Sequence, residues 1–447
     1  MEKALSIWRE YKREYMELMK LGFPVLLTQL GVIVMSFADT MMVGAYGVDE
    51  LASSAFVNNI FLIPLVMLSG LANGITPLVG ALYSKGNKKE AGRILRAGLQ
   101  INAIVSLCFM AIMTALYFNL DFFGQPEELL PVIRPYYVTM LFTLLPMALF
   151  NAAGQTCNGI TDTRTPMWCI LGAIAVNILF NWILIFGKFG FPELGLLGAG
   201  IATVMARVSG LVAILIIISR AKRYAPYREG LFDSGRLGYL RRKVWFTSYP
   251  VMIQSGVECG LWTIGAVVCG WFGKIQLAAY QVVNTIGQLG FMTFMSFGVA
   301  VSIRVANCCG VHNERGAGKA TRAGVHINMV LATIASLAIF IFARPLMHAF
   351  TPDEQVIAAA IHLVIPLVLY QYLDALQITF INAIRGTSQV KWLLWISLIS
   401  YMVVGIPMLL IFARGFGWES VGVYYSFNVA LLAAAILSGI IFKKIKI

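Results

Sequence analysis

Twelve long apolar stretches, separated by short polar segments, dominate this 447-residue chain. Each stretch is close to the roughly 20 apolar residues that an α-helix needs to cross a bilayer. Spanning β-strands would require a closed barrel and alternating polarity, and these stretches do not alternate. We therefore predict an all-α polytopic membrane protein with twelve transmembrane helices. The expected spans are 21–44, 52–82, 94–118, 131–155, 166–187, 196–219, 244–270, 278–309, 321–343, 357–383, 391–413 and 420–442.

The composition excludes the common classes of soluble protein. Only 12% of the residues are charged, whereas soluble domains carry about a quarter. The first twenty residues mix acids and bases and lack a small-residue cleavage site after a short apolar core. We read them as an amphipathic lead-in to the first span and not as a signal peptide.

The net charge of +13 follows from where the bases lie. Lys and Arg gather in alternate loops, around 85–90, 220–243 and 315–322, and after the last span. Basic residues mark the cytoplasmic side of membrane proteins, so we predict cytoplasmic termini and a multi-pass protein of the bacterial plasma (inner) membrane. The charge therefore needs no nucleic acid as a partner.

The two halves of the chain resemble each other. When residues 24–102 are shifted by 226 positions, 18 of the 79 aligned positions are identical. Asn87, Arg96 and Asn102 fall in register with Asn313, Arg322 and Asn328, which composition bias would not produce. A duplication is expected, with parallel six-helix repeats and substrate bound at their interface, as in transporters. The predicted division is a bundle at 1–220, a cytoplasmic linker at 221–243 and a bundle at 244–447.

Three of the 21 acidic residues lie deep in apolar stretches: Asp39, Glu258 and Asp374. An ionised carboxylate inside a bilayer costs at least ~2.5 kcal/mol, so each should face water, bind a cation or hold a proton. Ion pairing with the buried bases Arg207 and Arg304 is the structural alternative. Since two bases cannot neutralise three acids, at least one carboxylate should remain available to cations.

Other polar residues recur with helical spacing. Asn177 and Asn181 share one face of the fifth span, and Thr203 lies in the sixth. Carboxylate, amide and hydroxyl oxygens suit a small hard cation, so Asp39 with these residues is a candidate Na⁺ site. Two asparagines also serve as polar contacts between packed helices, and both interpretations remain open.

Signals for enzyme chemistry are missing from the sequence. Gly316-Ala-Gly-Lys319 lacks the remaining positions of a phosphate-binding loop and follows no strand. The four histidines are scattered, and the seven cysteines form no CxxC pair. We predict a non-enzyme without cofactor, whose transport draws on an ion gradient. A flippase for a lipid-linked oligosaccharide or peptidoglycan precursor and a lipid-modifying membrane enzyme are the alternatives.

Several strings resemble the multidrug and toxic compound extrusion (MATE) family across essentially the whole chain. They are Asp39-Thr-Met-Met-Val-Gly44, Asn158-Gly-Ile-Thr-Asp-Thr-Arg-Thr-Pro166, Leu277-Ala-Ala-Tyr-Gln281 and Val301-Ser-Ile-Arg-Val-Ala306. The resemblance implies a V-shaped antiporter, of the NorM-like branch, with two pseudo-symmetric six-helix bundles. Such proteins export organic, often cationic and aromatic compounds in exchange for Na⁺ or H⁺ by alternating access.

The resemblance also implies roles for particular residues. Asp39, Asn177, Asn181 and Thr203 match the family's amino-terminal cation site, with Ala199 as a backbone contributor. Glu258 and Asp374 match the acids of the NorM-like branch. Asp39, Tyr280 and Gln281 are the implied substrate contacts, although a histidine is usual at position 280. The implied partners are small-molecule drugs or toxins, a coupling cation and membrane lipid, and the protein is expected to be a monomer.

Overall fold

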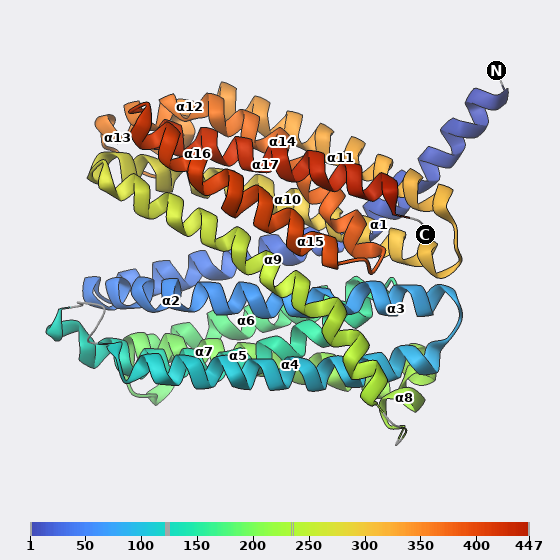
Figure 1. Ribbon diagram of the computed structural model, residues 1–447. Coiled ribbons are helices and arrows are strands. Elements are labelled where there is room, and N and C mark those ends of the chain that lie inside the picture. The colour runs from blue at the N-terminus through green and yellow to red at the C-terminus, as the bar shows by residue number, and fades with distance from the viewer. Residues whose placement is uncertain (1, 121–125, 234, 236, 446–447) are drawn as a thin grey trace. The chain divides into compact units, whose positions relative to one another are not determined.

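The computed structural model describes residues 2–120, 126–233, 235 and 237–445, and it is helical almost throughout (Figure 1). The helices of the first half are α1 Glu2–Tyr46, α2 Val48–Asn73, α3 Ile75–Ser84, α4 Lys88–Tyr117, η2 Glu127–Leu129, α5 Leu130–Gly159, α6 Arg164–Ile185, η3 Lys188–Gly190, α7 Gly195–Arg220, η4 Lys222–Tyr224 and α8 Ala225–Leu231. The second half contains α9 Gly238–Trp271, α10 Lys274–Gly310, α11 Glu314–Ile341, α12 Ala343–His348, α13 Glu354–His362, α14 Val364–Gly386, α15 Lys391–Ser397, η5 Leu398–Gly405, α16 Ile406–Leu410, η6 Ile411–Gly415 and α17 Glu419–Lys444.

Twelve helical segments of the described chain are long and apolar enough to span a membrane, which confirms the predicted all-α polytopic fold. The second span is interrupted where the backbone amide of Gly74 bonds the carbonyl of Leu71, between α2 and α3. The predicted span at 357–383 begins too early, because α13 ends at His362 and α14 carries the span. The eleventh span contains two π-helical segments, η5 and η6.

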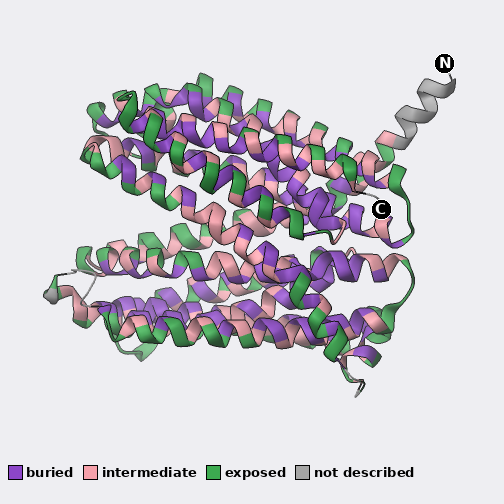
Figure 2. Ribbon diagram, viewed as in Figure 1, coloured by how far each residue is buried: buried purple, intermediate pink, exposed green. Residues whose placement is uncertain are grey.

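Exposed apolar side chains occur along these helices, as expected for surfaces in contact with lipid. Figure 2 shows exposed residues distributed along both units, and they include large apolar side chains such as Phe142, Val212 and Phe340. A water-soluble protein would not present so many apolar groups to solvent. The protein is therefore an integral, multi-pass membrane protein.

The chain forms two compact units, and their boundaries fall inside helices. One unit holds Met1–Leu26 with Ile253–Ile447, and the other holds Leu27–Met252. These boundaries differ from the predicted division at 221–243. Leu18 and Leu21 of α1 pack in a core with Ala300 of α10, so the first part of α1 belongs to the second-half helices. Correspondingly, Val244 at the start of α9 packs in a core of the first half.

Each unit repeats the close helix contacts of the other. A Cβ on Gly159 would press on Val79, and a Cβ on Gly386 would press on Val305, which is Val79 shifted by 226 residues. The side chains of Asn87 and Asn313 both accept hydrogen bonds as N-caps, of α4 and α11. Asn102 and Asn328 are both fully buried. The in-register residues of the predicted duplication thus occupy equivalent structural positions.

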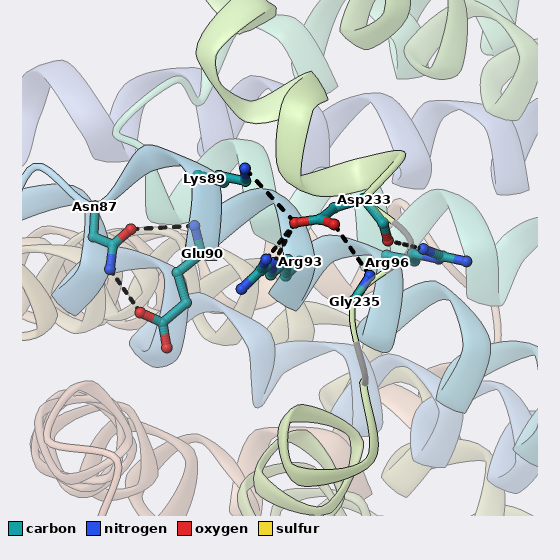
Figure 3. Close-up of polar contacts among 7 residues, drawn as sticks. All are labelled: Asn87, Lys89, Glu90, Arg93, Arg96, Asp233 and Gly235. Carbon is teal, nitrogen blue, oxygen red and sulfur yellow. Dashed lines mark hydrogen bonds and ion pairs between the residues drawn. The ribbon is translucent and has the colours of Figure 1, made fainter.

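The predicted linker is packed against the first-half helices, because its helix α8 contacts α4. The backbones approach so closely that a Cβ on Gly92 would overlap the carbonyl oxygen of Tyr227. Figure 3 shows the adjoining charge cluster, in which Lys89 and Arg93 contact the Asp233 carboxylate while Arg96 donates to the Asp233 carbonyl oxygen. The hydrogen bond from Arg93, above all, lowers the pKa of Asp233. The carboxylate therefore remains ionised at neutral pH.

Gly92→Ala should destabilise the protein. Its new methyl group must displace α8 from α4, and overpacking of this kind typically costs about 1–3 kcal/mol. Gly318→Ala is the matched control, since Gly318 is the equivalent residue of α11 and has open space around its Cα. Alanine is the better helix former, so the control should be neutral or slightly stabilising. Thermal unfolding of the purified variants measures both effects, and equal melting temperatures would contradict the assigned contact.

Candidate functional site

Asp39 is the end of a hydrogen-bonded chain that crosses three helices. The amide of Asn181 on α6 donates to the Asp39 carboxylate and contacts the Asn177 oxygen at 3.3 Å. Asn177 donates in turn to the Thr203 hydroxyl on α7 at 3.5 Å. Thr203 donates to the carbonyl oxygen of Ala199 at 3.0 Å. The structure therefore brings together all five residues predicted for the amino-terminal cation site.

This cluster is rich in oxygen atoms and poor in compensating charge. Asn177 and Asn181 are fully buried, and the Asn181 side-chain oxygen has no hydrogen-bond partner among the residues that the structure describes. Asp39 itself is half-buried. Within the described residues it forms no ion pair, and Arg207 interacts with it only at longer range. The Arg207 guanidinium instead contacts the Thr143 hydroxyl at 3.2 Å and the Met147 sulfur at 3.1 Å.

Glu258 of α9 is the centre of a second polar cluster, in the other unit. Gln254 donates to one carboxylate oxygen at 2.8 Å. Tyr401 of η5 and Gln377 of α14 donate to the other, at 3.3 and 3.5 Å. Gln377 also donates to the Tyr401 hydroxyl at 2.6 Å. Neutral donors from three elements thus surround this carboxylate.

Asp374 lies on α14, one turn before Gln377, and has a very different environment. It is 0% exposed, and neither carboxylate oxygen has a hydrogen-bond partner in the described part of the chain. Its strongest electrostatic neighbour is another acid, Glu258. An uncompensated carboxylate in such a place is costly, so it is a natural position for a proton or a cation.

Two expectations about buried bases need correction. Arg304 does not pair with any of the three membrane acids, because its guanidinium binds Glu14 of α1 at 2.7 and 3.2 Å. A third buried base, Arg385, escaped the sequence analysis because it lies two residues beyond the predicted end of its span. Arg385 is 4% exposed and contacts Asn382 at 2.9 Å and Gln254 at 3.4 Å. Gln254 therefore bridges Arg385 and Glu258.

The predicted substrate contacts have unequal environments. Tyr280 is buried, donates to the backbone oxygen of Trp262 at 3.1 Å and packs against Tyr424. It is an interior packing residue of its unit. Gln281 is exposed, and Asp39 lies in the other unit. The described residues contain no group of three His, Cys, Asp or Glu side chains able to hold a metal ion.

Tyr401, Gln254 and Gln377 were missed by the sequence analysis. Gln254 lies one helical turn before Glu258 and Gln377 one turn after Asp374, so i±3 and i±4 neighbours of the membrane acids would have identified both. Nothing in the sequence distinguishes Tyr401 from the other 16 tyrosines. Its contact with Glu258 arises from the fold.

The duplication of the chain agrees with the comparison to known families. The MatE family model matches the chain twice, at residues 24–183 and 250–411, which begin 226 residues apart like the internal repeat. The chain belongs to the MATE family. Relatives of this chain are transporters, in keeping with the prediction that this chain is not an enzyme.

MATE relatives match over nearly full length. A probable multidrug resistance protein NorM of Bradyrhizobium diazoefficiens is 28% identical over 94% of this chain and 91% of its own. The multidrug resistance protein NorM of Vibrio cholerae is 28% identical over 96% and 95%. The structure of the eukaryotic MATE transporter AtDTX14 aligns with a TM-score of 0.85 at 20% identity, covering 97% of each chain. A MOP superfamily transporter from Pyrococcus furiosus aligns with a TM-score of 0.87 at 17% identity, covering 96% of this chain and 95% of that chain.

Gln254→Leu should destabilise this protein. The substitution removes the bridge between Arg385 and Glu258 and leaves both with one partner fewer, which costs about 1–3 kcal/mol for a buried polar group. Gln288→Leu is the control, because Gln288 lies on α10, is exposed and makes no side-chain hydrogen bond within the described residues. Thermal unfolding in detergent should show a lower midpoint for Gln254→Leu alone. Equal midpoints would contradict the bridge.

Proposed function

We propose that this protein is a secondary active multidrug antiporter, which exports organic cations in exchange for Na⁺ or H⁺. The observation that carries the proposal is the placement of Asp39, Glu258 and Asp374 inside membrane-spanning helices, none of them in an ion pair within the described residues. Full-length similarity to NorM proteins named for multidrug resistance supports the same activity.

The Asp39 cluster is suited to the coupling cation. The Asp39 carboxylate, the Asn177 and Asn181 amides, the Thr203 hydroxyl and the Ala199 carbonyl place oxygen atoms from α1, α6 and α7 together. These are the hard ligands that a small alkali or alkaline-earth ion prefers. The same carboxylate can hold a proton instead, so the geometry accommodates either driving ion.

The Glu258 and Asp374 cluster is suited to proton or substrate exchange. Two acids interact across α9 and α14, and within the described part of the chain the base Arg385 reaches Glu258 through Gln254. Two neighbouring carboxylates resist simultaneous ionisation, so one holds a proton or binds a cation. An organic cation that occupies this position would displace that proton.

Exchange requires that each ligand bind the two access states with different affinity. If drug and coupling ion share a carboxylate, binding of one opposes binding of the other. The driving ion then binds from the outside and displaces the drug on that side. When the ion leaves on the inside, the carboxylate is free to bind another drug molecule. Alternating access between the two units couples these events.

The membrane orientation follows from the basic segments. Loops around 85–90, 220–243 and 315–322 carry the excess of Lys and Arg, so they and both termini are assigned to the cytoplasm and the protein to the bacterial inner membrane.

A flippase for a lipid-linked oligosaccharide or peptidoglycan precursor is the alternative. It would need a strongly cationic interior to hold pyrophosphate. In the described spans, Asp39 and Arg207 lie in one unit, and Glu258, Asp374 and Arg385 lie in the other, so acids outnumber these bases, a balance that favours cations over anions.

Asp39→Asn and Glu258→Gln should each reduce drug efflux by at least tenfold, because neutral amides can neither exchange a proton nor attract a cation. Ethidium efflux from proteoliposomes, with a Na⁺ or an H⁺ gradient imposed alone, measures the loss and identifies the driving ion. Asp49→Asn, at an exposed acid in the first turn of α2, is the control and should transport normally. Undiminished efflux in both membrane variants would defeat the proposal.

Cysteine labelling tests the orientation. In a background without native cysteines, Lys85→Cys should be protected from a membrane-impermeant maleimide in intact cells, while Glu193→Cys should react, because their loops are assigned to opposite sides and both residues are exposed. Both should react after permeabilisation. The reverse pattern would overturn the assigned topology.

A further inference from the structure

An apolar groove lies between α4, α7 and the end of the linker helix α8. Its volume is about 600 Å³, and its walls include Leu99 of α4, Val212 and Ile216 of α7, and Leu231 and Phe232 of the linker. Arg96 lies among the lining residues and is half-buried. The groove combines an apolar trough with a cationic group.

The exposed walls of this groove are suited to lipid and unsuited to water. Val212 and Ile216 are both 47% exposed on a membrane-spanning helix, and Phe232 is 73% exposed beside them. The Phe232 ring is exposed on a linker that packs against α4, so contact with an apolar partner would remove its surface from water. Because the groove adjoins two spanning helices, the acyl chains of membrane lipids can supply this apolar contact.

The rim of the groove carries uncompensated positive charge. Arg96 donates to the carbonyl oxygen of Asp233, and Arg228 donates to that of Ser219, which also lines the groove. Neither guanidinium forms an ion pair within the described residues. The Asp233 carboxylate cannot neutralise them, because Arg93 and Lys89 already occupy it (Figure 3). A guanidinium has five N–H donors, so both arginines retain capacity for an anion.

We propose that this groove binds an anionic phospholipid of the cytoplasmic leaflet, with an acyl chain against Val212, Ile216 and Phe232 and the phosphate at Arg96 and Arg228. The inference rests on the orientation assigned under the proposed function, which places this end of α4 at the cytoplasmic leaflet, where anionic lipids concentrate. The lipid bridges α4, α7 and the linker.

The second half of the chain provides an internal control. Arg322 is the duplicate of Arg96 on α11, and it is exposed. Gly318, the duplicate of Gly92, has open space where α8 covers Gly92. The groove is thus a property of the linker and not of the repeat, and the lipid site should occur once in the described chain.

Fluorescence quenching tests the proposal without a transport assay. Phe232→Trp places a reporter on the groove wall, and its emission is compared with that of the unsubstituted protein in vesicles that contain brominated phosphatidylglycerol or brominated phosphatidylcholine. The added emission should be quenched at lower mole fractions of phosphatidylglycerol. Arg96→Gln and Arg228→Gln, each in the Phe232→Trp protein, should lower this selectivity about fivefold, and Arg322→Gln should leave it unchanged.

Three outcomes would overturn the proposal. Equal quenching of the Phe232→Trp reporter by both lipids excludes a selective site even if the arginine variants fail to fold. An identical effect of Arg96→Gln and Arg322→Gln would show only a general surface charge. Competition by millimolar glycerol phosphate would indicate a soluble anion in place of a lipid. A transport-inactive protein with intact lipid selectivity would refute the proposed function alone.

Discussion

The cost of placing a carboxylate within hydrocarbon governs this structure. Asp39, Glu258 and Asp374 lie in the apolar parts of spanning helices, and each must be offset by hydrogen bonds, charge, water or a bound cation. The two units meet this demand in different ways. Asp39 ends an amide and hydroxyl chain that runs to the backbone of α7, while Glu258 lies among neutral donors and Asp374 has no donor within the described chain. Unequal environments of this kind give the three acids different affinities for protons and cations.

Tight helix contacts recur in the two halves of the chain. Gly159 and Gly386 allow close approach at equivalent places in the two halves, so the duplicated backbone is preserved where packing demands it. The acids inside the spans are not repeated: Asp39 falls opposite Gly265 when the chain is shifted by 226 residues. Duplication therefore supplied the scaffold, and later substitution gave each unit its own chemistry. The linker adds a further difference, because α8 covers Gly92 and leaves its duplicate Gly318 open.

Hydropathy and helical spacing predicted much of this structure, because both are local properties. The twelve spans follow from apolar run length, and the grouping of Asn177, Asn181 and Thr203 beside Asp39 was predicted from spacing and from family resemblance together. Contacts between distant segments were not predictable in this way. Arg304 pairs with Glu14, which is 290 residues away, and Tyr401 reaches Glu258 across 143 residues. Arg385 was missed because its apolar run ends before it, although its helix continues.

The central claim is that exported compound and driving ion compete for the same buried carboxylates. Equilibrium binding of ethidium to the purified protein, measured over a grid of pH and Na⁺ concentration with no gradient present, tests it most directly. The account predicts that ethidium affinity falls as protons or Na⁺ accumulate, with reciprocal release of the bound ion when ethidium is added. Constant ethidium affinity across the whole grid, with no ion released, would contradict it.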